Sequence, residues 1–139
     1  MSYDEKNAWV YALVAIGGYA GYLVVILGRA QGVPLTSVAY VMPMILAISA
    51  ATAASIVGHI VIAAARPKEA GRTDQRDKEI HRHGEYVGGM VLAVSVIVPL
   101  GLAMAEIDYF WIANAIYLAF VLSALCGTAV KLVTYRRGF

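Results

Sequence analysis

Long apolar stretches dominate the chain, and one strongly charged segment, residues 66–85, divides them into two pairs. A helix needs about 20 apolar residues to cross a hydrocarbon core of about 30 Å, and four stretches approach or exceed that length. These stretches are residues 8–28, 35–65, 87–105 and 109–135. The pattern predicts an all-α polytopic membrane protein, with four transmembrane helices in an antiparallel up-down bundle that forms a single domain over residues 1–139.

Prolines, glycines and charged residues set the expected helix limits. We expect helices at about 8–29, 35–65, 74–105 and 109–135. The third helix begins in the charged segment, because Asp74 is a good N-cap and opposite charges recur at helical spacing after it. It is therefore expected to extend into the cytoplasm as one rod with the membrane span. Gly71 provides the turn before this rod, whereas Pro43 and Pro99 are expected to bend the second and third helices.

Basic residues are distributed very unevenly between the two sides of the predicted membrane. Of 11 Lys and Arg residues, only Arg29 falls on the side opposite the termini and the charged segment. The positive-inside rule therefore predicts a multi-pass protein with both termini in the cytoplasm. With 60% hydrophobic residues and a net charge of only +2, the lipid bilayer is the expected partner and no nucleic-acid binding is expected.

Small residues recur at intervals of four in every predicted span. The two clearest motifs are Gly17-xxx-Gly21 and Gly84-xxx-Gly88. Helices in lipid associate through such rows, because small side chains let two backbones approach closely. Further rows are Ala47, Ala51 and Ser55, then Ala115, Ala119, Ser123 and Gly127. These rows exceed what one bundle needs, which predicts a homo-oligomer, with a dimer favoured.

A polar stripe within the second span is the main candidate for chemistry. Thr52, Ser55 and His59 lie within about 60° of each other on a helical wheel. An ionisable residue inside a membrane is a functional candidate, so His59 is open to several interpretations. It could be a hydrogen-bonded structural residue, a proton relay, part of a transport path, or a haem or metal ligand. Asn114, in the fourth span, is interpreted as a packing residue that hydrogen-bonds to another helix.

The enzyme motifs that can be tested in a sequence are missing. There is no HExxH, no GxSxG and no Walker loop, and Cys126 is the only cysteine. His81 and His83, at positions i and i+2 of a helix, point in nearly opposite directions and are not expected to chelate one ion. No catalytic residue, cofactor or metal site is therefore predicted, and the protein is not expected to be an enzyme.

The run Asp74-Gln-Arg-Asp-Lys-Glu-Ile80, followed by Gly84 and Gly88-Gly89, resembles a signature of small four-helix bacterial membrane proteins of unknown function. That signature is a D-x-R-D/E-x-x-I stretch before the third membrane helix. The resemblance implies a prokaryotic protein of the bacterial inner (plasma) membrane. It implies no catalytic residue and no cofactor.

The charged helix is the predicted interaction surface, because it combines dense charge with an aliphatic residue, Ile80, that is expected to be exposed. Its residues are Arg76, Asp77, Glu79, Ile80 and Arg82. The function expected first is self-association, or docking of another membrane protein through this helix. One alternative is a dimeric small transporter or channel whose path is lined by His59 and Thr52. Another is a haem- or metal-binding membrane protein that uses His59.

Overall fold

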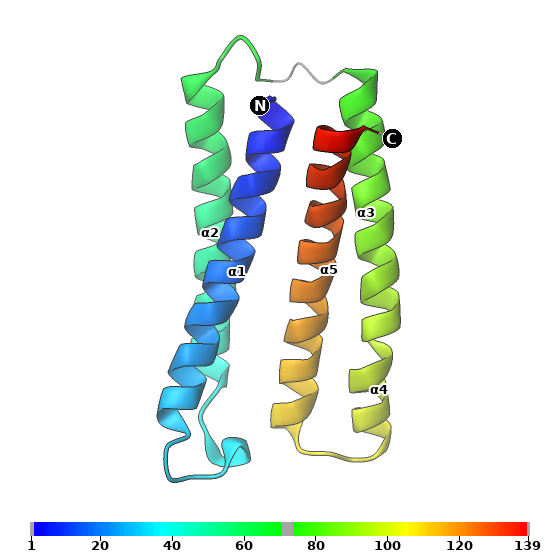
Figure 1. The fold of residues 1–139 in the computed structure, drawn as a ribbon. Helices are drawn as coiled ribbons and strands as arrows, with labels where there is room; N and C mark the ends of the chain where they lie inside the picture. Colours follow the sequence, from blue (N-terminus) through cyan, green and yellow to red (C-terminus); the bar gives the residue numbers. More distant parts are fainter. Residues whose placement is uncertain (1, 71–73, 139) are drawn as a thin grey trace.

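A computed structural model describes residues 2–70 and 74–138, and every regular element in them is helical (Figure 1). The elements are α1 (Tyr3–Arg29), a short 3-10 turn η1 (Leu35–Ser37), α2 (Val41–Ala65), α3 (Gln75–Ser95), α4 (Ile97–Met104) and α5 (Tyr109–Arg137). By length and composition, α1, α2, α5 and the combined rod of α3 and α4 can each cross a membrane. The predicted all-α bundle with four membrane-spanning helices is confirmed.

The helices pack as two antiparallel pairs that are joined through their inner members. In one pair α1 packs on α2, in the other α5 packs on α3 and α4, and α1 packs on α5 (Figure 1). The order across the molecule is therefore α2, α1, α5, α3, with α2 and α3 at the two edges. Both termini lie at the same end as the connection that leaves α2 and enters α3 (Figure 1).

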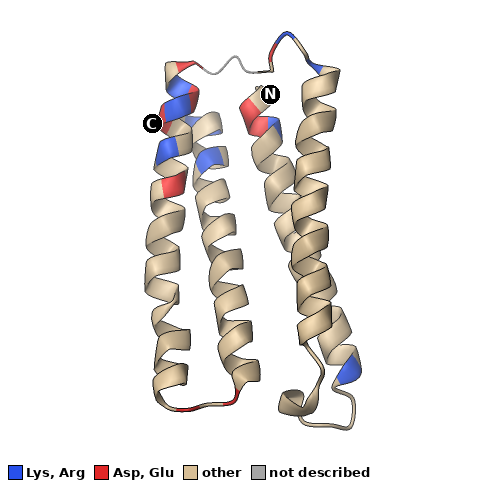
Figure 2. Ribbon diagram, turned by 180° about the vertical axis from the view of Figure 1, so that it is seen from behind, with Lys and Arg blue, Asp and Glu red and all other residues tan. Residues whose placement is uncertain are grey.

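Charged residues gather at this end of the bundle (Figure 2). One basic residue, Arg29 at the end of α1, lies at the opposite end together with the acidic turn before α5 (Figure 2). We call the end that carries the termini the charged end. Among the described residues, the structure thus brings together at one end the basic residues that the sequence assigns to one side of the membrane.

Two helices begin at residues other than those predicted. The first helix was expected from about residue 8, but α1 begins at Tyr3, because the Ser2 hydroxyl caps it by accepting a hydrogen bond from the Glu5 amide. The second was expected from residue 35, but α2 begins at Val41. Pro43 therefore lies in its first turn, where its missing N–H needs no partner. The prediction that Pro43 bends the helix is wrong.

The third rod agrees closely with its prediction. The Asp74 carboxylate caps α3 by accepting a hydrogen bond from the Asp77 amide, with an oxygen–nitrogen distance of 2.7 Å. The rod runs to Met104 and is interrupted at Val96, three residues before Pro99, as expected where proline removes a donor from the helix. The turn predicted at Gly71 lies outside the described residues.

An aromatic core fills the end of the bundle that lies away from the charges. Tyr22 and Ile26 of α1 pack there against Phe110, Tyr117 and Val121 of α5 and against Val38 of the connection. The Tyr22 hydroxyl donates a hydrogen bond to the Asn114 side-chain oxygen, and the Asn114 amide donates to the Phe110 carbonyl. The predicted role of Asn114 as a packing residue that hydrogen-bonds across helices is confirmed.

Backbones approach most closely where α3 crosses α5. Gly84, Gly88 and Gly127 are buried there, and a Cβ atom added to Gly127 would lie only 2.8 Å from the Gly84 carbonyl oxygen. The Ser123 hydroxyl donates to the Gly88 carbonyl oxygen at 2.7 Å. By contrast, Gly17 and Gly21 have no atom within 4 Å of an added Cβ. The first GxxxG motif is therefore not used within the chain.

Candidate functional site

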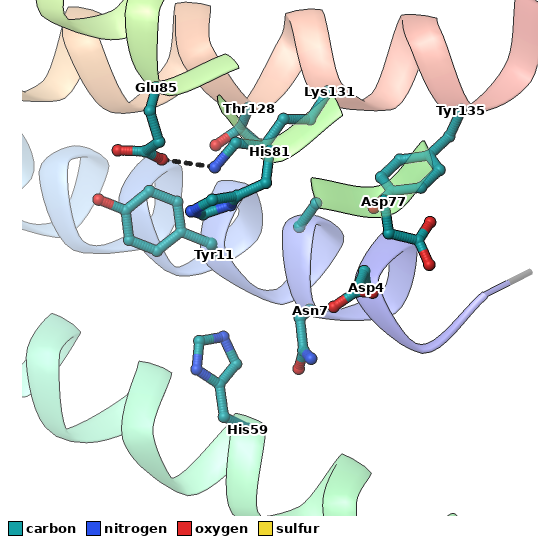
Figure 3. Close-up of a pocket in the computed structure, with 11 residues that line it drawn as sticks. Asp4, Asn7, Tyr11, His59, Asp77, His81, Glu85, Thr128, Lys131 and Tyr135 are labelled. Carbon is teal, nitrogen blue, oxygen red and sulfur yellow. Dashed lines mark hydrogen bonds and ion pairs between the residues drawn. The ribbon is translucent and has the colours of Figure 1, made fainter. Parts of the chain in front are cut away.

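Helices α1, α2, α3 and α5 all contribute to a polar pocket at the charged end, with a volume of about 410 Å³ (Figure 3). Its lining comprises Asp4, Asn7, Ala8, Tyr11, His59, Asp77, His81, Glu85, Thr128, Lys131 and Tyr135. We use the name polar pocket for this set. The pocket lies just outside or at the ends of the apolar stretches, where water and lipid headgroups meet the hydrocarbon core.

Helical spacing explains why these side chains meet. Asp77, His81 and Glu85 are four residues apart on α3, so they form one row along a single face. The N-terminal turns of α1 contribute Asp4 and Asn7 from the neighbouring side (Figure 3). Because chain direction alternates between neighbouring rods, the last turns of α5 and α2 reach the same level.

One ion pair on the pocket wall neutralises its buried cation. The Lys131 ammonium lies 2.6 Å from a Glu85 carboxylate oxygen, as drawn in Figure 3. The Lys131 side chain is only 14% exposed, whereas that of Glu85 is 64% exposed. The hydrogen bond from Lys131 lowers the pKa of Glu85, and partial burial opposes this effect. This pair therefore adds no net charge to the pocket near neutral pH.

The Asp4 and Asp77 carboxylates have no such partner. Within the described residues, no Lys or Arg forms an ion pair with either of them. Burial raises the pKa of Asp4, the Asp77 carboxyl raises it further through its charge and a side-chain hydrogen bond, and His81 opposes these effects. The Tyr135 hydroxyl is a further hydrogen-bond partner of Asp77. Asp4 precedes the apolar part of α1, so its carboxylate belongs to the charged end. These two groups are the acidic part of the pocket that no Lys or Arg of the described residues neutralises.

Asn7 adds a further unsatisfied acceptor. Its side-chain oxygen is buried and has no hydrogen-bond partner among the described residues. A buried polar atom without a partner costs about 1–3 kcal/mol, so such atoms are uncommon in folded chains. Figure 3 shows the Asn7 side chain on the same side of α1 as the His59 ring of α2.

An apolar groove of about 590 Å³ lies next to the pocket, along the apolar part of the bundle. We use the name apolar groove for its lining, which is Tyr11, Val14, Ala15, Ile48, Ala51, Thr52, Ser55, Ile56, His59, Tyr117, Phe120, Val121 and Ala124. It lies between α2 and α5, across α1. Tyr11 and His59 line both cavities, so they mark the place where the polar pocket and the apolar groove meet.

The predicted polar stripe faces this groove. Thr52, Ser55 and His59 all line it, on the part of α2 that looks toward α5 across α1. The Thr52 hydroxyl donates to the Ile48 carbonyl oxygen of its own helix, which satisfies the hydroxyl without a neighbouring helix. His59 is the one ionisable residue of α2, and its side chain lines the groove.

The predicted interaction surface divides between two faces of α3. Ile80 is 1% exposed, so the expectation that it is an exposed aliphatic residue is wrong. It lies on the face of α3 that packs into the bundle, and Asp77 on the same side lines the polar pocket. Glu79 and Arg82 are exposed and border an outer depression with His83 and Tyr86. Arg76 is exposed and donates to the Tyr135 carbonyl oxygen.

Most of the pocket lining was not singled out from the sequence, and Asn7 and Lys131 are the two such residues that matter most for its chemistry. Lys131 carries a usable signal, because it is a basic residue within the last apolar stretch and needs a partner there. Asn7 carries none, because its isolation depends on which helices surround it. Among the described residues, no three His, Cys, Asp or Glu side chains are grouped closely enough to hold a metal ion.

No protein-family model, curated protein or solved structure matches this chain. The structure defines a class only: a membrane protein with four long apolar helices packed as a bundle. This architecture is the part of the resemblance to small four-helix bacterial membrane proteins that the structure supports, and no family is assigned.

Proposed function

We propose that the chain is a prokaryotic inner-membrane protein that functions by self-association, most simply as a homodimer. The observation that carries this proposal is the exposure of α2. This helix lies at one edge of the bundle, and none of the 18 residues in its most apolar window is buried within the chain. A second copy packed on α2 would cover this edge.

A shallow groove between α1 and α2 offers the small residues that such contacts need. It measures about 510 Å³ and is lined in part by Gly17, Gly21, Leu46 and Ala50. On a wheel of 100° per residue, Leu46 and Ala50 lie roughly 150–190° from the polar stripe of α2. A dimer formed here would leave the apolar groove open.

The test replaces the two open glycines. The double variant Gly17→Leu and Gly21→Leu is expected to fold, because both positions face open space in one chain, and to lose the dimer because leucine prevents close approach. Single-molecule photobleaching in liposomes, over a dilution series, measures the oligomer. The matched control is Gly89→Leu with Gly101→Leu, at two equally open positions. A dimer that persists in the first variant, or a monomeric parent protein, contradicts the proposal.

The outer face of α3 is the proposed docking surface for a membrane partner. Glu79 and Arg82 are exposed on it, and Arg76 adds a second exposed guanidinium. Reversal of both arginines, Arg76→Glu with Arg82→Glu, is expected to abolish capture of the partner in a pull-down while helix content stays unchanged. Capture that is unaffected by both reversals would remove this part of the proposal.

The charged end is proposed to face the cytoplasm. In a Cys126→Ser background, a cysteine introduced as Glu79→Cys should resist a membrane-impermeant maleimide added to intact cells, whereas Glu106→Cys at the other end should react. Reaction of the first variant and protection of the second would reverse the orientation.

A second candidate function is a dimeric small transporter or channel. The observation that favours it is the common groove of Thr52, Ser55 and His59, which adjoins the polar pocket at His59 and Tyr11. Flux of ions or cationic dyes into proteoliposomes should then fall in His59→Ala while the dimer stays intact. The alternative of haem or metal ligation by His59 needs a second ligand, and an absorbance scan for a Soret band together with metal analysis tests it.

A further inference from the structure

The polar pocket and the apolar groove are neighbouring cavities of different chemistry that share Tyr11 and His59 in their linings. The pocket, about 410 Å³, lies at the charged end, and the groove, about 590 Å³, runs along the membrane-spanning part of α1, α2 and α5. Each volume is within the range of about 300–1,000 Å³ that is usual for small-molecule sites. Such a site matches a molecule that has a polar head and an apolar tail.

Within the described residues, the polar half contains two neighbouring carboxyl groups without a Lys or Arg partner and one buried acceptor without a donor. Asp4 and Asp77 are acceptors when ionised, and the buried Asn7 oxygen has no donor among the described residues. Its ammonium group, on Lys131, is already paired with Glu85. The lining also contains hydroxyl donors, one of which, on Tyr135, bonds to Asp77, but it offers no Lys or Arg that is free of a carboxylate partner. A cationic donor is therefore the group that would neutralise the two carboxylates and provide the Asn7 oxygen with a donor.

Other ligand heads fit this lining less well. An anionic head would meet two carboxyl groups that no described Lys or Arg neutralises, and Lys131 could bind it only by leaving Glu85. A bare divalent metal ion would need a closer group of ligands than the described residues supply. A primary ammonium head matches best, because it brings one positive charge and three donors, as a lysine side chain does.

We propose that the polar pocket binds the primary ammonium group of an amphipathic amine, whose apolar tail lies in the groove between α2 and α5. Asp4, Asp77 and the Asn7 oxygen accept hydrogen bonds from the head. Tyr11 and His59, at the junction, contact the first atoms of the tail. This inference goes beyond self-association, because the groove lies on the side of α2 away from the proposed dimer contact.

The probe is octylamine, which is protonated near neutral pH in the same way as lysine. Titration calorimetry with the protein in lipid nanodiscs, corrected with empty nanodiscs, compares octylamine with octanol and octanoate. We expect saturable binding of octylamine, at least about tenfold weaker binding of octanol, and no binding of octanoate. Equal binding of octylamine and octanol would mean that the tail alone is bound, and the proposal would be wrong.

Variants then test each half of the site. Asp4→Asn with Asp77→Asn keeps the side-chain shapes and should weaken octylamine binding about tenfold or more, with no change for octanol. The matched control, Glu106→Gln with Asp108→Asn, removes two carboxylates at the opposite end and should bind as the parent does. An unchanged affinity in the first variant overturns the assignment of the head. If that variant does not fold, the comparison of amine with alcohol on the parent protein still decides.

The tail is tested by filling the groove. Thr52→Phe, at an exposed position of the lining, should remove most of the affinity that octylamine gains over ethylamine, whereas Ile60→Phe, at an exposed position outside the lining, should not. An unchanged gain in Thr52→Phe places the tail elsewhere. Binding should be unaffected by Gly17→Leu with Gly21→Leu, so failure of the dimer proposal and failure of this one are separable. The calorimetric measurement of binding is also independent of the flux assay that tests the transporter alternative.

Discussion

The two helix pairs use the same kind of sequence in different ways. Both α3–α5 and α1–α2 carry glycine or alanine at intervals of four, which predicts close packing in lipid. In the first pair Gly84, Gly88 and Gly127 are buried against each other. In the second pair Gly17 and Gly21 face open space.

The two pairs also differ in their polar contacts. The α3–α5 crossing is fixed by the hydrogen bond from Ser123 to the Gly88 carbonyl and by the Glu85–Lys131 pair. Within the described residues, no side-chain hydrogen bond joins α1 to α2, whose contact is made by Gly18 against Ala51 and by Val10 against Gly58. A small-residue row thus indicates that close approach is possible; polar contacts accompany it in α3–α5, and apolar contacts alone accompany it in α1–α2.

The largest expected effect on stability is at the α3–α5 crossing. In Gly127→Ala the new methyl group would lie 2.8 Å from the Gly84 carbonyl oxygen, so the two backbones must separate. We expect a loss of about 2–3 kcal/mol in the free energy of unfolding, as for an overpacked core. The measurement is an SDS titration in mixed micelles, followed by circular dichroism.

The matched substitution in the α1–α2 pair is Gly17→Ala. It meets no atom within 4 Å and should be neutral in stability, or stabilising by up to about 1 kcal/mol because alanine favours helix. If both variants lose the same free energy, the two pairs do not differ in the way described.

A smaller effect is expected in the aromatic core that joins the pairs. Tyr22→Phe removes the hydroxyl that donates to Asn114, at a side chain that is 2% exposed. We expect a loss of about 0.5–1.5 kcal/mol in the free energy of unfolding, measured by the same SDS titration. Tyr11→Phe, at an exposed tyrosine on almost the same face of α1, is the control and should change stability little. A Tyr22→Phe variant as stable as the parent would show that the hydrogen bond does not hold α1 on α5.

The sequence was sufficient for features that depend on short stretches of chain. The number of apolar spans, the Asp74 cap and the break near Pro99 follow from composition and helix chemistry, and the structure confirms them. The start of α2 was mispredicted because Pro43 is compatible either with a bent helix or with a first turn. Hydropathy does not distinguish these two cases, since the residues before Pro43 are apolar in both.

The site was predictable only in part, because it depends on the order of the rods. That Thr52, Ser55 and His59 share one face follows from their spacing alone. That this face meets Tyr11 and a polar pocket requires α1 to lie between α2 and α5, which no periodicity reveals. Ile80 shows the same limit, because a charged helix with one aliphatic residue gives no indication of which face packs on α5.

The smallest expected effect is the pH dependence of the free energy of unfolding. Glu85 and Asp4, both at the charged end, contribute to it with opposite signs. The pKa of Glu85 is lowered by Lys131, so this pair stabilises the fold above the ordinary glutamate pKa of about 4.5 and loses its contribution as the pH falls through the lowered value. Because Glu85 is largely exposed, the contribution is below about 1 kcal/mol. The pKa of Asp4 is raised by burial and by Asp77, so ionised Asp4 destabilises the fold, and this penalty disappears as the pH falls.

Thermal unfolding from pH 7 to pH 3 separates the two contributions. The advantage of the parent over Glu85→Gln should shrink toward acid pH, whereas the parent should gain on Asp4→Asn over the same range. Glu79→Gln, an exposed carboxylate on the outer face of α3, is the control and should run parallel to the parent. Parallel curves for all three variants would mean that neither carboxylate is coupled to folding. The Glu85–Lys131 ion pair and the Asp4 carboxyl would then not differ in their effect on stability. The electrostatic reason for placing an ammonium group in the polar pocket would be lost as well.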